Sequence, residues 1–219
     1  VLKRKVMTYR MIIYYLHNFV FKVAFWLNLS KNVARTGKGA IYVANHCSVI
    51  DLMVCFASLY PFAGFAKRVL FYIPALAGYM RNAGFIRVRR NDPVRLAEAY
   101  EEAREVLKKG DTFLIFAEGT RSEDGHLQKF RKGAFKLAIE ADVPIVPVII
   151  KNTFYYLPKH KFWVNPDKEH RFIHVETLPP VKYTGDPNVS DLVKIKKLKE
   201  IVWNQMNEKI EEFMGDKSS

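Results

Sequence analysis

Hydrophobic positions along the chain follow two spacings. Short runs rich in β-branched and aromatic residues predict strands, and longer segments with apolar residues every three or four positions predict amphipathic helices. The strand-like runs are residues 40–44, 62–66, 85–89, 112–116, 144–150 and 171–176. Strands that alternate with helices predict an α/β fold with a largely parallel mixed sheet flanked by helices, in which ligand sites form beyond the carboxyl ends of strands.

The helical segments carry recognisable ends. Residues 93–109 follow Asp92 at the capping position, begin with Pro93 and close at Gly110, which is the usual asymmetry of helix ends. Further helices are expected at about 132–141 and 191–213. The last of them carries one apolar side made of Leu192, Ile195, Leu198, Val202 and Met206.

The N-terminal segment is apolar enough to raise the question of a membrane. Residues 11–29 are nineteen mostly apolar residues interrupted by Lys22, and a central lysine costs roughly 2.5 to 3.5 kcal/mol in a membrane span. A helix or helix pair lying in the interface is therefore favoured over a clean span, with a buried core helix as the other interpretation. We expect a membrane-associating helical element over 1–34 and an α/β domain over 35–219.

Charge adds an anionic partner to this picture. The chain of 219 residues has 35 Lys and Arg against 22 Asp and Glu, a formal charge of +13, which suits nucleic acid, an anionic bilayer or a phosphorylated substrate. Its only cysteines, Cys47 and Cys55, show neither a metal-ligand spacing nor a disulfide framework, as expected in a reducing, cytoplasmic compartment. The six histidines form no ligand cluster, so no metal is expected.

The stretch "ANHCSVID", residues 44–51, places an imidazole and a carboxylate at a junction between two apolar segments. If Ser48 caps the next helix, Asp51 falls at its third position and completes a capping box, which needs no function. His46 then stands at the carboxyl end of a strand, outside the helix. There the turn can fold back so that Asp51 accepts a hydrogen bond from His46, leaving a general base.

A second polar junction follows the strand at 112–116. The stretch "FLIFAEGTRS" ends in Glu118, Gly119, Thr120 and Arg121, which offer backbone N–H groups, a hydroxyl and a guanidinium at one point. Such groups suit a phosphate, which arginine can bind in a bidentate fork. A polar turn with an exposed arginine is the alternative. The two stretches together, in this order and each at a strand end, are unlikely to arise by chance.

These two stretches resemble the glycerolipid acyltransferases, specifically the 1-acylglycerol-3-phosphate (lysophosphatidate) acyltransferase family. The family signature NHxSxxD matches "NHCSVID" at 45–51, and its phosphate motif EGTRS matches 118–122. The resemblance covers roughly residues 35 to 155.

Two further blocks extend the resemblance. The stretch "GFIRVRR" at 84–90 matches a third family motif with Arg90 at the family's arginine, although Arg89 replaces the usual acidic residue. The run "VPIVPVII" looks like the fourth block, with Pro147 at its marker position.

The resemblance implies transfer of an acyl group from an acyl thioester, acyl-CoA or acyl-ACP, to the sn-2 hydroxyl of lysophosphatidate, giving phosphatidate for phospholipid biosynthesis. His46 would take the proton from the hydroxyl while Asp51 orients His46, and the hydroxyl would attack directly. The chemistry needs no further cofactor and no metal. Backbone amides at the helix N-terminus after His46 are candidate donors for the oxyanion.

The resemblance also implies how the acceptor is held. Arg121 and Arg90, aided by Thr120 and Gly119, would bind the phosphate, and Glu118 would be a positioning group. Lys67 resembles a family lysine near the site, although "KR" is more often a solvated pair.

The implied location is the cytoplasmic face of a membrane. An anionic membrane surface and an acyl-CoA or acyl carrier protein explain the basic charge, and no nucleic-acid partner is expected because no reading motif accompanies the basic clusters.

Three alternatives stay open at this point. Cys47 or Ser48 could act as a nucleophile in a ping-pong route. The acceptor could be another lysolipid. The chain could also be a basic membrane-binding module without catalysis.

Overall fold

The computed structural model describes the part of the chain that carries both polar junctions. Most of the expected membrane-associating element lies outside the described residues, and so does Arg90. The described ranges are 29–34, 39–59, 61–67, 71–72, 77–78, 80–81, 83–89, 92–160 and 172–215. In this part of the chain, no helix combines the length and the hydropathy needed to cross a bilayer.

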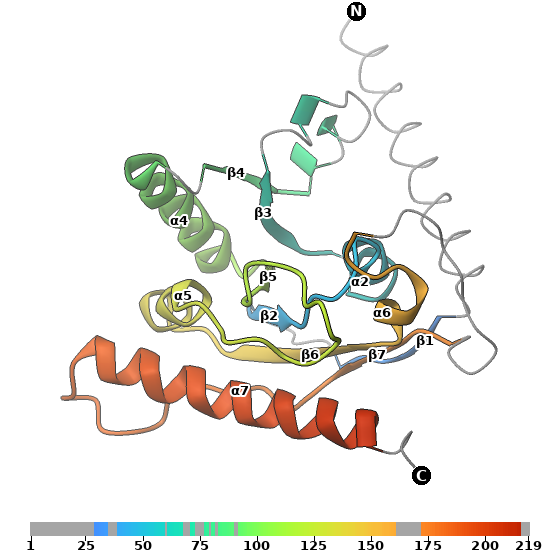
Figure 1. Cartoon of the computed structure of the whole chain (residues 1–219). Helices are drawn as coiled ribbons and strands as arrows, with labels where there is room; N and C mark the ends of the chain where they lie inside the picture. The colour runs from blue at the N-terminus through green and yellow to red at the C-terminus, as the bar shows by residue number, and fades with distance from the viewer. Residues whose placement is uncertain are drawn as a thin grey trace, which may run out of the picture.

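A seven-stranded sheet lies at the centre of the described residues, in the order β1-β7-β6-β2-β5-β3-β4 (Figure 1). Neighbouring strands are parallel, except that β6 and β7 are antiparallel. The predicted largely parallel mixed sheet is confirmed, with all six predicted strands. The strands are β1 (Ser30–Asn32), β2 (Ile41–Ala44), β3 (Ala63–Lys67), β4 (Ile86–Val88), β5 (Phe113–Phe116), β6 (Ile145–Lys151) and β7 (His174–Thr177).

The first strand has no hydrophobic signature. β1 is the polar sequence SKN, so its pairing with β7 depends on tertiary context rather than on a local pattern. It lies upstream of residue 35, where the α/β domain was expected to begin, and the sheet therefore includes residues assigned to the N-terminal element.

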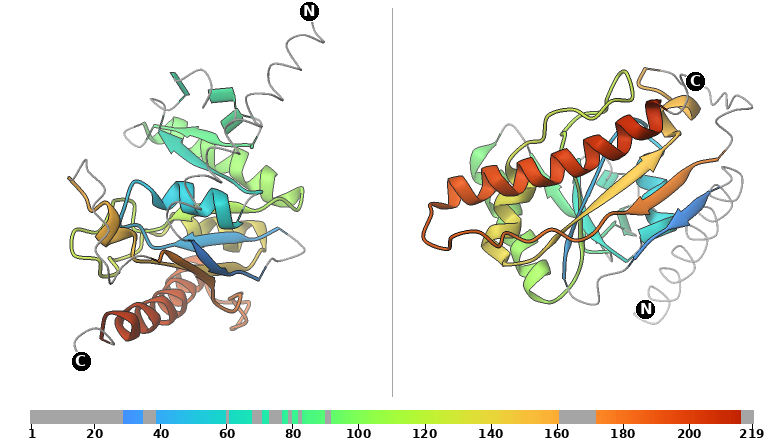
Figure 2. Two further views of the ribbon diagram at one scale, coloured as in Figure 1. Left: turned by 90° about the vertical axis from the view of Figure 1, so that its right-hand side faces the viewer. Right: turned by 90° about the horizontal axis from the view of Figure 1, so that it is seen from below.

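Helices cover both faces of the sheet (Figures 1 and 2). Residues Ile41 and Val43 of β2 pack with α4, α5 and α7, whereas Tyr42 and Ala44 pack on the opposite face with α2. The predicted helices are confirmed within two residues at each end. The helices are α2 (Asp51–Leu59), α4 (Pro93–Lys108), α5 (Gly133–Ala141), the short unpredicted α6 (Thr153–Tyr156) and α7 (Asp191–Gly215).

The sheet divides at β3. Ala63 and Gly64 pair with β5, whereas Phe65, Ala66 and Lys67 pair only with β4. β3 therefore diverges from β5 toward its carboxyl end, the edge where parallel sheets bind ligands. The divergence opens the sheet beside the residues that follow β5.

Candidate active site

Asn45 anchors the turn that follows β2. Its side-chain amide donates to the carbonyl of Ile150 at 2.9 Å and accepts from the N–H of Ile150 at 2.7 Å. The two bonds join the end of β2 to β6, and Asn45 is buried. These bonds fix the backbone at the end of β2, and so they fix the direction in which the chain continues to His46.

His46 and Asp51 meet as the sequence predicts. Nδ1 of His46 lies 2.8 Å from Oδ2 of Asp51, and the same oxygen accepts from the N–H groups of Cys47 and Ser48, each at 2.8 Å. Asp51 is fully buried, while the His46 side chain is 21% exposed. No described residue bonds the other imidazole nitrogen, Nε2, so this partly exposed side of the ring can meet a ligand.

The expected capping box forms only in part. α2 begins at Asp51 rather than just after Ser48, so Asp51 is its first residue and not its third. The N–H of Ser48 does donate to Asp51, but the Ser48 hydroxyl donates to the carbonyl of Leu157 at 2.6 Å. The Ser48 oxygen still accepts locally, but from the N–H of Ile50 at 3.4 Å rather than from that of Asp51.

Those same bonds remove two candidate oxyanion donors. The backbone amides after His46 were expected to be free for a ligand. The N–H groups of Cys47 and Ser48 point instead at Asp51, where they satisfy one oxygen, Oδ2, of a buried carboxylate.

Phe116, the last residue of β5, stacks on the imidazole. The ring centroids of His46 and Phe116 lie 4.1 Å apart with an interplanar angle of 21°. Ser122 also donates its N–H to the carbonyl of His46 at 2.7 Å. Local patterns do not reveal either contact, because β2 and β5 are neighbours only in the folded sheet.

Glu118 is buried and holds backbone on both sides. Its Oε1 accepts from the N–H of His46 at 2.7 Å, and its Oε2 accepts from the N–H of Gln128 at 3.0 Å. Burial is the largest influence on its acidity and raises the pKa of Glu118 to about 7, although both hydrogen bonds act in the opposite direction. Glu118 therefore ties the two junctions together, with both oxygens already engaged.

The glycine turn brings two arginines near this point. Gly119 has a φ of +77°, and a Cβ there would clash with Nε of Arg131. Thr120 is exposed and Arg121 is half-buried, and no described carboxylate pairs with Arg121. Arg131, which the motifs do not single out, thus packs where only glycine leaves room.

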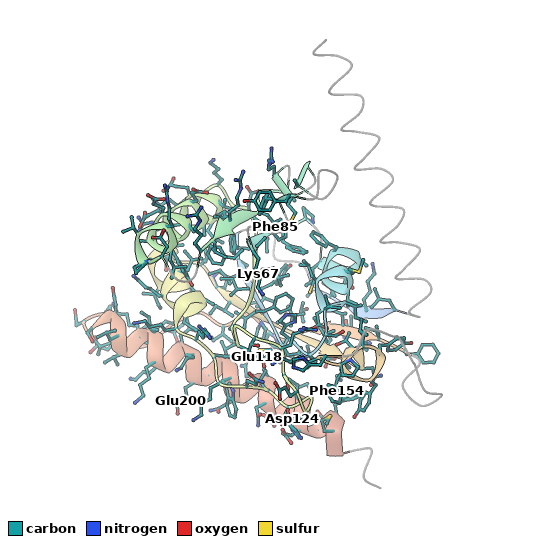
Figure 3. The ribbon with its side chains drawn as sticks, turned by 45° about the horizontal axis from the view of Figure 1, so that its top comes forward. Lys67, Phe85, Glu118, Asp124, Phe154 and Glu200 are labelled. Atoms are coloured by element: carbon teal, nitrogen blue, oxygen red, sulfur yellow. The ribbon has the colours of Figure 1, made fainter. Side chains whose placement is uncertain are left out.

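Lys67 ends β3 and is exposed. In the view of Figure 3 it lies between Phe85 and Glu118, on the side of the site where β3 diverges from β5. It lies at the carboxyl end of β3, and its role at the site stays a prediction.

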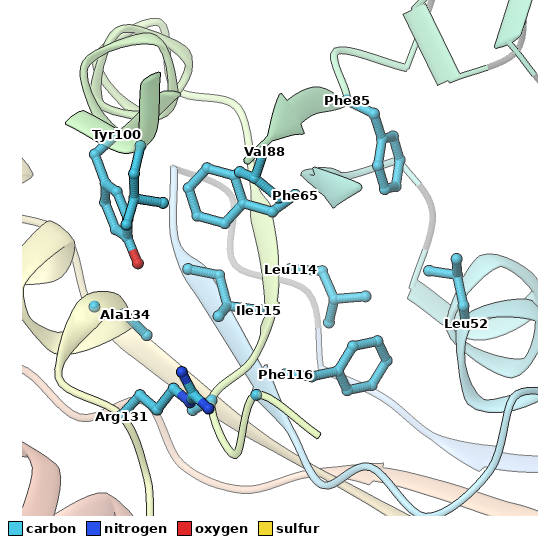
Figure 4. Close-up of a pocket in the computed structure, with 14 residues that line it drawn as sticks. Leu52, Phe65, Phe85, Val88, Tyr100, Leu114, Ile115, Phe116, Arg131 and Ala134 are labelled. Atoms are coloured by element: carbon cyan, nitrogen blue, oxygen red, sulfur yellow. The ribbon is translucent and has the colours of Figure 1, made fainter. Parts of the chain in front are cut away.

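An apolar pocket of about 240 Å³ fills the division of the sheet (Figure 4). Phe65 and Leu114 line it from β3 and β5, Phe116 lies at the end nearest His46, and Gly119 and Arg131 add polar groups. Phe116 therefore lies between the pocket and the imidazole of His46, on which it stacks.

Cys47 shares the site but is poorly suited to nucleophilic attack. Burial, reinforced by the charges of Asp51 and Glu118, raises the pKa of the Cys47 thiol well above its usual range. In the described part of the chain no group of three or more His, Cys, Asp or Glu is placed to hold a metal ion.

The fold and the site define an α/β protein with a histidine–carboxylate pair at the carboxyl edge of a mostly parallel sheet. The Acyltransferase family model matches residues 28–151. Because this match spans more than half of the chain, the chain belongs to the Acyltransferase family.

Individual relatives agree with this assignment. A 1-acyl-sn-glycerol-3-phosphate acyltransferase of Limnanthes douglasii is 36% identical over 165 residues, which are 73% of this chain and 57% of that protein. The chloroplastic enzyme LPAT1 of Arabidopsis thaliana, which has the same activity in its name, is 31% identical over 65% of this chain and 43% of its own. The chain therefore spans about half the length of the curated relatives it matches.

A solved structure is similar over most of its length. The crystal structure of the 1-acyl-sn-glycerophosphate (LPA) acyltransferase PlsC from Thermotoga maritima has a TM-score of 0.72 and 27% identity, covering 96% of this chain and 83% of that one. The resemblance that the motifs predict is confirmed at the level of the family.

Proposed function

We propose that the protein transfers a fatty acyl group from an acyl thioester to the sn-2 hydroxyl of lysophosphatidate. The observation that carries this proposal is the His46–Asp51 pair at 2.8 Å, with Nε2 directed away from the carboxylate. The names of the relatives support lysophosphatidate as the acceptor. The product would be phosphatidate, a precursor of phospholipids.

His46 acts as the general base in this proposal. Nε2 takes the proton as the acceptor hydroxyl attacks the thioester carbonyl carbon, and the resulting imidazolium is stabilised by Asp51. When the tetrahedral intermediate collapses, the carbon–sulfur bond breaks and the imidazolium returns the proton to the departing thiolate. The buried carboxylate holds Nδ1 protonated, which keeps Nε2 available as the acceptor.

The acceptor phosphate would bind beside the glycine turn. Arg121 is half-buried without a described carboxylate partner, and a guanidinium of this kind suits a phosphate. Thr120 and the backbone of Gly119 would contribute hydrogen bonds, with Lys67 and Arg90 completing the positive environment. Glu118 acts indirectly, as a positioning residue that holds the backbone of His46.

The apolar pocket would receive an acyl chain. Its lining by Phe65, Leu114 and Phe116 is apolar, and such a lining suits an acyl chain. An apolar chain in this space would bring its thioester toward the imidazole.

Direct attack is favoured over an acyl-enzyme. The Ser48 hydroxyl is fully buried and donates to Leu157, and the raised pKa of Cys47 keeps its thiol protonated. Neither group is prepared to act as a nucleophile.

The location at the cytoplasmic face of a membrane stays a prediction, because it rests on the sequence of residues 1–28 and on the charge of the chain.

Thiol release from a long-chain acyl-CoA tests the proposal. We expect release to require lysophosphatidate and to fall about 10²- to 10⁴-fold in His46→Ala. His126→Ala is the matched control, because His126 also pairs with a carboxylate, Glu211, at 2.9 Å but on the surface.

Three results would contradict this mechanism. A burst of thiol without acceptor would indicate an acyl-enzyme, and a preference for other lysolipids would change the acceptor. Vesicle binding without any transfer from acyl-CoA or acyl-ACP would indicate a membrane-binding module.

A further inference from the structure

A second recess, of about 560 Å³, lies at the β4 edge of the sheet, away from the histidine–carboxylate pair. It is formed by β4, the start of α4 and the segment before β4. Four arginines and two carboxylates line it: Arg81, Arg87, Arg89, Arg95, Glu98 and Glu102. We name this the arginine recess.

The arginine recess carries an excess of positive charge. Arg95 pairs with Glu98 at 2.9 Å, whereas no described carboxylate forms an ion pair with Arg81, Arg87 or Arg89. Three guanidinium groups therefore face the single remaining carboxylate. Several guanidinium groups in one concave site bind a phosphate group more strongly than they bind a carboxylate or a surface with few charges.

Aromatic rings give the arginine recess a second kind of contact. The guanidinium of Arg87 lies over the ring of Phe71, 5.0 Å from its centroid, and Phe85 forms part of the wall. Phosphate-binding arginines, flat apolar surfaces and carboxylates that accept from N–H or O–H groups together match a nucleotide. A flat anionic bilayer would instead be met by protruding cations, without carboxylates set among them.

The arginine recess and His46 both lie at the carboxyl end of the parallel strands. Arg89 directly follows β4, and three strand spacings separate β4 from β2 in the order β2-β5-β3-β4. At regular spacing this is roughly 14 Å, and the divergence of β3 from β5 makes it larger at this end. Phe85 lines both the arginine recess and the apolar pocket; Figure 4 shows it at the border of the pocket. The two sites therefore adjoin at Phe85.

We propose that the arginine recess binds the nucleotide end of a coenzyme A thioester. Arg87 and Arg89, two residues apart and so on one side of the chain, would hold its phosphates. The proposal rests on the acyl transfer proposed above and deepens it, because it makes acyl-CoA the donor. The arm between nucleotide and sulfur is about as long as four residues of main chain, roughly 14 Å when extended, which is of the same order as the separation across the sheet.

Binding of adenosine 3′,5′-bisphosphate, measured by titration calorimetry on the detergent-purified full chain, tests this site without turnover. We expect the double variant Arg87→Ala/Arg89→Ala to weaken binding at least tenfold. Lys108→Ala/Lys109→Ala removes the same charge from an exposed helix end outside the recess and should bind like the wild type. Adenosine 5′-monophosphate, which lacks one phosphate, should bind the wild type more weakly than the bisphosphate does. Its affinity should also fall by a smaller factor in the arginine variant.

Three outcomes would overturn the proposal. One is an absence of bisphosphate binding by the wild type, and another is equal weakening in the arginine and lysine variants. The third is loss of binding to phosphatidate vesicles in the arginine variant while its bisphosphate affinity stays unchanged, which would identify a lipid headgroup site.

Kinetics separate this proposal from the proposed function. Arg87→Ala/Arg89→Ala should raise KM for acyl-CoA at least tenfold with little change in kcat, and should leave KM for acyl-ACP unchanged. His46→Ala should lower kcat and still bind the bisphosphate. If the wild type binds the bisphosphate but transfers no acyl group, the proposed function fails while the arginine recess stands as a nucleotide site.

Discussion

At the scale of single residues, one oxygen of Asp51 performs two tasks. Oδ2 accepts from two backbone N–H groups, which shape the turn before α2, and from Nδ1 of His46, which orients the imidazole. A capping role and a catalytic role are therefore not alternatives here. The same buried charge supports both, because three donors converge on it and offset its desolvation.

Replacing Asp51 by Asn should damage both tasks unequally. The neutral amide no longer stabilises an imidazolium and can present N–H groups to donors that need an acceptor. We expect kcat to fall about 10²- to 10⁴-fold, with a smaller loss of about 1 to 3 kcal/mol in unfolding free energy. Steady-state kinetics and denaturant unfolding measure the two effects.

Asp186→Asn supplies the control for that measurement. Asp186 also accepts a backbone N–H, from Asn188 at 2.8 Å, but on an exposed loop. It should change neither kcat nor stability appreciably. If Asp51→Asn retained wild-type kcat, Asp51 would be a turn-forming residue only.

At the scale of elements, the turn after β5 brings the backbone of Gly119 close to the side chain of Arg131. Gly119 adopts a left-handed φ of +77°, and the side chain of Arg131 fills the space that a Cβ would need. The turn thus places an arginine next to the backbone where a phosphate is proposed to bind. A residue with a side chain at 119 would displace that arginine.

Gly119→Ala should therefore affect acceptor binding as well as stability. We expect a loss of about 1 to 2 kcal/mol in unfolding free energy from the left-handed backbone, plus an increase in KM for the acceptor. Gly110→Ala is matched in backbone conformation, with a φ of +87°, but a Cβ there meets nothing within 4 Å. It should show the strain alone, with KM unchanged; similar KM values in both variants would refute a role for the packing against Arg131.

At the scale of the whole molecule, Glu118 couples local acidity to global stability. Its carboxylate joins the end of β2 to the segment at Gln128 from within the protein interior. Because burial raises its pKa to about 7 from the usual value of 4.5, the folded protein holds a proton between these two pH values that the unfolded chain has already released. The contribution of Glu118 is then largest below about pH 4.5 and declines as the pH rises toward 7.

Glu118→Gln should remove this pH dependence. The stability of the wild type relative to the variant should fall by roughly 3 kcal/mol between pH 4.5 and pH 8, measured by denaturant unfolding at each pH. For Glu123→Gln, the stability of the wild type relative to the variant should instead rise with pH, because Lys159 lowers the pKa of Glu123. A flat or rising difference for Glu118→Gln would indicate that its two N–H bonds outweigh burial.

Much of the fold follows from local pattern. The run at 144–150 is apolar throughout because β6 is buried on both faces, and the ends of α4 follow from Asp92 and Pro93. β1 escapes prediction because its three polar residues pair with β7, which is 144 positions away in register. Local chemistry predicts elements that carry their own signature, and an edge strand of three residues carries none.

The candidate site likewise combines contacts that a local pattern predicts with contacts that only the paired strands create. His46 and Asp51 lie five positions apart, so a single turn brings them together. Phe116 contacts His46 only because β2 and β5 pair in the sheet, and the real partners of Glu118 are 72 and 10 positions away. The division of the sheet after Gly64 is likewise invisible in any single segment.

By itself, the sequence determined the α/β architecture, the family and the residues of the two polar junctions, since periodicity and short motifs are local properties. Only the tertiary structure decided which backbone groups those residues satisfy, where the apolar pocket opens and how four arginines gather at β4. These depend on strand order and register, which bring distant segments to one edge of the sheet. Burial then sets the acidity of Glu118, because only folding removes its carboxyl group from water.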